Sequence, residues 1–189
     1  MSEQHLVATP GQTVGPFFGF ALPYDGGQHL VPVGRPGSVR LTGRVLDGHA
    51  NPVPDALLEI RQADESGRVP RQAGSLRRDG YTFTGWGRAA TDSTGRYSFT
   101  TVRPGATEAD RPPFIAMTVF ARGLLNRLFT RVYLPADEAS LGADPLLGSL
   151  PQERRRTLVA VADGDELRFD VRLQGEDETV FLRYPGHSL

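Results

Sequence analysis

The feature that most constrains the fold is an alternation of apolar and polar residues in several short segments. Segments 39–45, 96–101 and 167–173 each place an apolar or aromatic side chain at nearly every second position. Because side chains two residues apart in a strand share a face, each segment predicts a strand with one buried face. A helical period is not sustained over any long segment. The chain is therefore predicted to be mostly β.

Residues typical of turns separate these segments. "DGHANP" follows the first strand, and "TDSTGR" precedes another. Further strands are predicted within 55–64 and 125–135, whereas 136–156 fits short helical turns. There, Asp144 is suited to capping, and Pro145 and Pro151 to first helical positions. Several short strands with Gly and Pro turns and minor helix predict an all-β fold, an antiparallel β-sandwich of the prealbumin-like type.

The chain divides into two parts by pattern. Residues 1–37 are rich in Gly and Pro and show no sustained period, which predicts an extended N-terminal arm. Residues 38–189 are predicted to form the sandwich. Segment 65–80, rich in Arg, Gly and Ser, is interpreted as a loop or a binding edge. The arm contains the apolar stretch "PFFGFAL", which favours a role as an interface.

The run "RPPFIAMTVFARG", residues Arg111 to Gly123, is predicted to hold the most deeply buried strand. Its residues from Phe114 to Phe120 are apolar or small at almost every position, so both faces are expected to be buried. None of these side chains binds a metal strongly or transfers a proton. The run nevertheless ends in Arg122, a permanent cation.

Composition excludes several classes of function. The 189 residues suffice for one domain. They include no cysteine, which rules out disulfides and thiolate sites and fits a reducing, cytoplasmic compartment. All 21 basic residues are arginine and the net charge is −1, without the basic surplus of nucleic-acid-binding proteins. No stretch approaches the length of a membrane span, so a membrane partner is not expected.

No catalytic constellation emerges from the residues alone. The four histidines are not spaced as a local pair of metal ligands, and the five tyrosines are better explained as core or interface aromatics. Neither a nucleophile motif nor a phosphate-binding glycine loop is present. Taken by itself, the chain looks catalytically empty.

Four stretches carry a resemblance to a known family. "EIRQAD", "GWGRAATDSTGRYSFTTVRPG", "RPPFIAMTVFARGL" and "FDVRLQGEDETVF" together resemble the intradiol ring-cleaving dioxygenases, over roughly Thr9 to Phe181. More narrowly, "TPGQTVGPFF", "FARG" and "LQGEDETVF" resemble the alpha chains of two-chain members. The resemblance covers nearly the whole chain.

The resemblance implies that this chain holds no metal. In the family's catalytic chains, two tyrosines and two histidines bind Fe³⁺, and the histidines come from an Arg-Pro-x-His-Ile-His strand. Phe114 and Ala116 stand at the two histidine positions here, and Val69 stands at the first tyrosine position. No tyrosine occurs in 104–111, and Arg61 replaces a tryptophan usual in the family. The implied Fe³⁺ therefore belongs to a homologous, iron-bearing beta subunit.

The resemblance also implies a shared active site in a hetero-oligomer of alpha-beta pairs. Gly15, Pro16 and Arg122 would line the substrate pocket of the partner, while no residue of this chain would be catalytic. The implied reaction inserts O₂ into protocatechuate between its hydroxyl-bearing carbons and gives 3-carboxy-cis,cis-muconate. Without the resemblance, Arg122 would be interpreted as an exposed arginine in a turn, and Gly15 and Pro16 as residues that shape the arm.

Three interpretations compete at this point. The chain is a non-catalytic subunit that completes a dioxygenase pocket, a free-standing β-sandwich binding module, or an independent dioxygenase with a different metal site. The third needs ligands that the sequence does not supply, and the second does not explain an apolar arm. The first explains the arm, the missing ligands and the retained arginine together.

Overall fold

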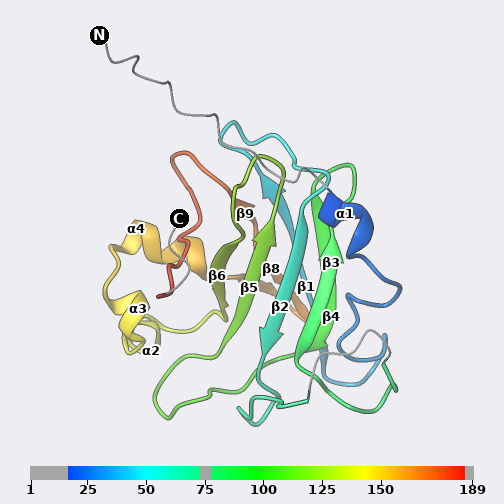
Figure 1. Ribbon diagram of the computed structural model, residues 1–189. Helices are drawn as coiled ribbons and strands as arrows, with labels where there is room; N and C mark the ends of the chain where they lie inside the picture. The colour runs from blue at the N-terminus through cyan, green and yellow to red at the C-terminus, as the bar shows by residue number, and fades with distance from the viewer. Residues whose placement is uncertain (1–16, 73–77, 186–189) are drawn as a thin grey trace, which may run out of the picture.

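The computed structural model describes residues 17–72 and 78–185, whose strands form two sheets packed face to face (Figure 1). The first sheet has the order β4-β1-β8-β7, with β9 also beside β1. It comprises β1 (Ser38–Leu46), β4 (Arg96–Val102), β7 (Val161–Asp163), β8 (Glu166–Arg168) and β9 (Val171–Arg172). The second sheet has the order β3-β2-β5-β6 and comprises β2 (Leu57–Gln62), β3 (Trp86–Ala90), β5 (Phe114–Phe120) and β6 (Leu128–Tyr133). The predicted β-sandwich is confirmed.

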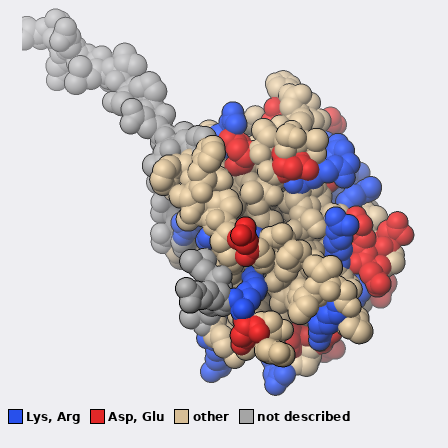
Figure 2. Space-filling model, turned by 90° about the vertical axis from the view of Figure 1, so that its right-hand side faces the viewer, with Lys and Arg blue, Asp and Glu red and all other residues tan. Residues whose placement is uncertain are grey.

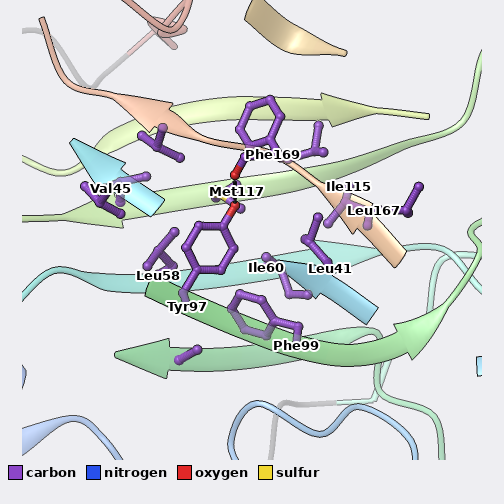
Figure 3. Close-up of a cluster of buried hydrophobic side chains, with 14 of the residues drawn as sticks. Leu41, Val45, Leu58, Ile60, Tyr97, Phe99, Ile115, Met117, Leu167 and Phe169 are labelled. Atoms are coloured by element: carbon purple, nitrogen blue, oxygen red, sulfur yellow. Dashed lines mark hydrogen bonds between the residues drawn. The ribbon is translucent and has the colours of Figure 1, made fainter. Parts of the chain in front are cut away.

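The core lies between the two sheets and is built from the inward side chains of both (Figure 3). Leu41, Phe99 and Leu167 come from the first sheet and are fully buried. Ile60 and Ile115 face them from the second sheet and are at most 1% exposed. Burying each such side chain contributes about 1.5–3 kcal/mol. The apolar positions of the alternating segments are thus what holds the sheets together.

The last alternating segment, predicted as one strand, is divided into β8 and β9. Both pair in parallel with β1: Leu167 lies opposite Leu41, and Val171 lies opposite Val45. Other neighbouring strands pair antiparallel, as β1 does with β4 and β2 with β5. The prediction of one continuous strand was therefore wrong, although its apolar side chains do face the core.

The division between β8 and β9 has a local cause. The hydroxyl of Tyr97 donates to the carbonyl oxygen of Phe169 at 2.5 Å (Figure 3), and the Arg44 N–H donates to the Asp170 carboxylate at 2.9 Å. Side chains therefore satisfy the Arg44 N–H and the Phe169 carbonyl, the two groups that would form the next bond of the parallel ladder. Gly43 permits this close approach, because a Cβ added there would lie 1.8 Å from the Phe169 carbonyl oxygen.

Strand β5 is fully buried on one face only. Ile115, Met117 and Val119 point into the core, whereas the alternate side chains, Phe114, Ala116, Thr118 and Phe120, are half-buried. The prediction that both faces are buried was therefore wrong for the second face. That face belongs to the outer side of the second sheet, which is relevant to the candidate site.

Short helices lie beside β6, at the edge of the second sheet (Figure 1). They are α2 (Glu138–Gly142), α3 (Pro145–Gly148), α4 (Gln152–Arg155) and the 3₁₀ turn η1 (Arg156–Leu158). Asp144 caps α3 by accepting from two backbone N–H groups, and Pro145 is the first residue of that helix, as predicted. Pro151 instead takes the capping position before α4. In the described part of the chain, no helix is long and apolar enough to cross a membrane.

The predicted N-terminal arm contains the helix α1 (Phe17–Ala21) and a segment bound to the sandwich. The Leu30 N–H donates to the Thr100 carbonyl at 2.8 Å, and the Thr100 N–H donates to the Gln28 carbonyl at 3.0 Å. Leu30 is 4% exposed and belongs to the core. The later part of the predicted arm therefore adds to the sandwich, and residues 1–16 lie outside the described residues.

Candidate functional site

Arg122 lies in the turn that directly follows β5. The Leu124 N–H donates to the Ala121 carbonyl at 3.3 Å, and Gly123 has a φ of 81°, which suits glycine. The Arg122 side chain is 62% exposed. The turn thus holds a guanidinium at the edge of the molecule, where a partner could reach it.

Asp55, two residues before the neighbouring strand β2, binds Arg122. The β2–β5 pairing places Leu57 opposite Phe120, and continuing this register brings Asp55 opposite Arg122. Arg122 Nη2 lies 2.6 Å from Asp55 Oδ2, and Arg122 Nε lies 3.0 and 2.8 Å from Oδ1 and Oδ2. The hydrogen bonds to this carboxylate raise the pKa of Arg122. One edge of the guanidinium is therefore occupied, and an external carboxylate must approach another edge or displace Asp55.

Helix α1 lies beside this ion pair. The rings of Phe18 and Phe120 are 6.1 Å apart, and a Cβ added at Gly19 would lie 3.6 Å from the Asp55 carbonyl oxygen. Two of the helix's own aromatic side chains remain in solvent: Phe17 is 70% exposed and Phe20 is 85% exposed. Exposed aromatics beside an arginine are typical of protein interfaces.

The predicted site residues are thus only partly placed. Arg122 lies next to α1, whereas Gly15 and Pro16 lie outside the described residues.

On the side of the molecule shown in Figure 2, basic and acidic side chains are interspersed around a centre of uncharged ones. This distribution accords with the net charge of −1 and gives that side no dominant sign of charge.

The positions that correspond to iron ligands by resemblance include two on the outer face of β5. The guanidinium carbon of Arg131 lies 4.2 Å from the centroid of the Phe114 ring. Ala116 lies between Arg61 and Arg131 of the neighbouring strands. The third position, Val69, is 50% exposed. None of the three side chains at these positions offers an oxygen or nitrogen donor, so these residues do not fit a ferric ion.

A polar cluster lies where β6 meets the helices. The hydroxyl of Tyr133 donates to Asp144 Oδ1 at 3.0 Å and accepts from Arg131 Nη1 at 3.0 Å. Burial raises the pKa of Tyr133 to about 12, and the guanidinium of Arg131 offsets this only in part. The phenol therefore stays protonated at neutral pH. Within residues 17–72 and 78–185, no cluster of three or more His, Asp or Glu side chains could hold a metal ion.

Replacing Tyr133 by phenylalanine is expected to reduce the dependence of stability on alkaline pH. The folded-state pKa is raised from 10.0 to about 12, so the native state keeps this proton longer than the unfolded chain does. The resulting stabilisation is complete below about pH 10 and is lost as the pH rises towards about 12. Urea unfolding at several pH values across this range gives the slope of the free energy of unfolding against pH for wild type and for Tyr133→Phe.

The control for this experiment is Tyr81→Phe, because Tyr81 is 96% exposed and has nearly the same surroundings after unfolding. It should leave the slope of wild type unchanged. Equal slopes for wild type and Tyr133→Phe would show that the Tyr133 hydroxyl does not cause the loss of stability at alkaline pH.

The arrangement around Arg122 can bind and orient an anionic group, but it cannot itself carry out redox or hydrolytic chemistry. The ion pair of Arg122 with Asp55 and the contact of Arg131 with Phe114 were not predicted from the sequence. Both contacts depend on strand register. Asp55 precedes β2, and the antiparallel pairing of β2 with β5 places the start of β2 beside the end of β5. The sequence does not show that β2 and β5 are neighbours, and without that pairing their register cannot be predicted.

A family model and three known protein chains match most of this chain. The chain matches the sequence model of a family described as "Dioxygenase" over residues 14–175. It is 43% identical to the protocatechuate 3,4-dioxygenase alpha chain of Burkholderia cepacia, covering 94% of this chain and 98% of that one. The alpha chain of Pseudomonas putida is 37% identical, with coverages of 97% and 100%. The beta chain of the B. cepacia enzyme is 32% identical, with coverages of 97% and 83%.

Solved structures support the fold at lower identity. The dioxygenase domain of a carbohydrate-binding fusion protein from Streptomyces sp. SirexAA-E superposes with a TM-score of 0.55 at 24% identity, covering 79% of this chain and 88% of that one. Hydroxyquinol 1,2-dioxygenase from Pseudomonas putida gives a TM-score of 0.53 at 19% identity, with coverages of 90% and 68%. At these identities the likeness shows a common sandwich and nothing finer.

Proposed function

The chain belongs to the intradiol dioxygenase family, and we propose that it is the iron-free alpha subunit of a hetero-oligomeric protocatechuate 3,4-dioxygenase. The observation that carries the proposal is the replacement of the family's ligand positions by Phe114, Ala116 and Val69 in an otherwise intact sandwich. The match to two alpha chains over nearly their full length supports it. So does the 32% identity to a beta chain, because such a homologue is the proposed partner.

The proposed complex cleaves protocatechuate with O₂ to 3-carboxy-cis,cis-muconate, and its Fe³⁺ is held by the beta subunit. This chain contributes binding and orientation. Arg122, fixed by Asp55, directs positive charge at the substrate carboxylate from the mouth of the partner's pocket. Gly15 and Pro16 complete the wall of that pocket with backbone. We place the complex in the cytoplasm, which the absence of cysteine supports.

In the same proposal, residues 38–189 are the dioxygenase-like sandwich and residues 1–37 are an intersubunit arm, whose segment around Leu30 also packs on the sandwich. Helix α1 is the described part of the arm that contacts the partner, because Phe17 and Phe20 expose large apolar surfaces beside Arg122. Covering them with a partner removes about 25 cal/mol of unfavourable hydration per Å² of apolar surface. The arm and the arginine thus belong to one contact surface.

Co-expression with the homologous beta chain tests the proposal. The two chains are expected to co-purify and to cleave protocatechuate together, whereas this chain alone should show no turnover. A double Phe17→Ser, Phe20→Ser variant should lower the yield of complex while leaving the fold intact. Val161→Ser is the matched control, because Val161 is 56% exposed but lies in β7. Protocatechuate cleavage by the lone chain, or failure of the wild-type chains to associate, would refute the proposal.

A further inference from the structure

The outer face of the first sheet carries a polar groove of about 1020 Å³. Two hydroxyl side chains, Thr42 and Ser98, lie directly opposite each other at its floor. The Thr42 hydroxyl donates to Glu166 Oε1 at 2.6 Å, and Ser98 Oγ accepts from Arg40 Nε at 3.1 Å. Because the Ser98 oxygen is the acceptor in that bond, its hydroxyl proton can still be donated to a bound molecule.

Four arginines surround these hydroxyls. Arg40 and Arg44 flank Thr42 along β1 on the same face, and Arg168 of β8 lies beside Thr42 on its other side. Arg96 of β4 lies directly opposite Arg44. We call this set the arginine ring, and all four side chains line the groove and are exposed: Arg40, Arg44, Arg96 and Arg168.

The groove is lined by the four cations of the arginine ring and by three carboxylates, those of Asp92, Glu166 and Asp170. In the described part of the chain, no Asp or Glu oxygen lies within 4.0 Å of any of the four guanidiniums. These carboxylates instead accept from other groups: Asp170 from the Arg44 backbone N–H, Glu166, opposite Arg40 in the sheet, from the Thr42 hydroxyl, and Asp92 from the Arg96 backbone N–H. The remaining cation of the groove, Arg88, pairs with Glu59.

Like charges placed directly opposite in a sheet destabilise it, as Arg44 and Arg96 must do. A multivalent anion would reverse this cost, and the planar donors of arginine match both carboxylate and phosphate. We propose that the arginine ring binds a small anion with at least two negative charges, of the polycarboxylate or phosphate class. This site lies on the sheet opposite the one that carries Arg122 and does not depend on the proposed function.

Calorimetric titration of the full-length chain with citrate and with inorganic phosphate, at constant ionic strength, tests the site. Saturable binding is expected, and an Arg44→Gln, Arg96→Gln double variant should weaken it at least about tenfold. Arg168→Gln alone should weaken it less, which keeps the test decisive if the double variant fails to fold. Arg71→Gln is the matched control, because Arg71 is exposed and does not line the groove. The tighter of the two anions identifies the class.

Thermal unfolding gives an independent readout. Citrate should raise the Tm of wild type and of Arg71→Gln more than sodium chloride does at the same ionic strength, and this excess should be lost in the double variant. Equal affinity in wild type and both groove variants would overturn the proposal. An increase in Tm that sodium chloride reproduces would also overturn it. So would binding of poly-glutamate when citrate and phosphate do not bind, because that result indicates an acidic protein partner.

Discussion

Replacing Arg122 by alanine in the assembled complex is expected to lower catalytic efficiency with protocatechuate roughly ten- to a hundredfold. A charged hydrogen bond to the substrate carboxylate is worth about 1.5–3 kcal/mol, which corresponds to this range. Uncharged catechol has no carboxylate to lose, so its efficiency should change little. The ratio of kcat/KM for the two substrates is therefore the quantity to measure, with the iron content of each preparation checked.

Two further variants show whether the Arg122 charge is responsible. Asp55→Asn removes the carboxylate that occupies one edge of the guanidinium, so preference for protocatechuate should be kept or increased. Arg156→Ala is the matched control, because Arg156 is 69% exposed and also pairs with an aspartate, Asp177, at 2.9 Å. It should leave the ratio unchanged. If Arg122→Ala keeps the ratio within about twofold of wild type, Arg122 is only a turn residue.

Replacing Gly43 by alanine is expected to destabilise the sandwich by about 3 kcal/mol or more. The new Cβ would lie 1.8 Å from the Phe169 carbonyl oxygen and 2.6 Å from its carbon. These are backbone atoms, so the clash cannot be relieved by a rotamer change. Relief requires β1 and the segment after β8 to separate, which also breaks the hydrogen bond from Tyr97.

The control for Gly43→Ala is Gly142→Ala at the end of α2. A Cβ at Gly142 meets no heavy atom within 4 Å, and its φ is not positive. This control should be neutral or slightly stabilising, because alanine lowers the entropy of the unfolded chain. Equal denaturation midpoints for the two variants would mean that the close approach of the Phe169 carbonyl does not require glycine at position 43.

The fold could be predicted where buried residues are large and alternate, and not where they are small. Strand β3 was missed because its inward positions are Gly87 and Ala89, which give no hydrophobic signal. Gly87 is needed there because Leu30 occupies the space, only 2.4 Å from an added Cβ. Leu30 itself lies in the predicted arm, so the contact that explains β3 joins segments that no local pattern connects.

The candidate site, like the fold, could be predicted from the sequence only in part. The position of Arg122 at the end of an apolar strand follows from the sequence, because a strand and a Gly turn fix it locally. Its ion pair with Asp55 does not, since it depends on the register between β2 and β5. The half-exposed outer face of β5 was also missed, because an apolar run looks the same whether its second face meets a core or a partner.

The iron content of the separated chains tests the central claim most directly. The full-length chain purified alone is expected to contain no stoichiometric ferric iron and to lack visible tyrosinate-to-iron absorption, because Phe114, Ala116 and Val69 offer no donors. The complex with the beta chain should show both the iron and the absorption. Stoichiometric iron with that absorption in the lone chain would contradict the assignment of this chain as the iron-free subunit.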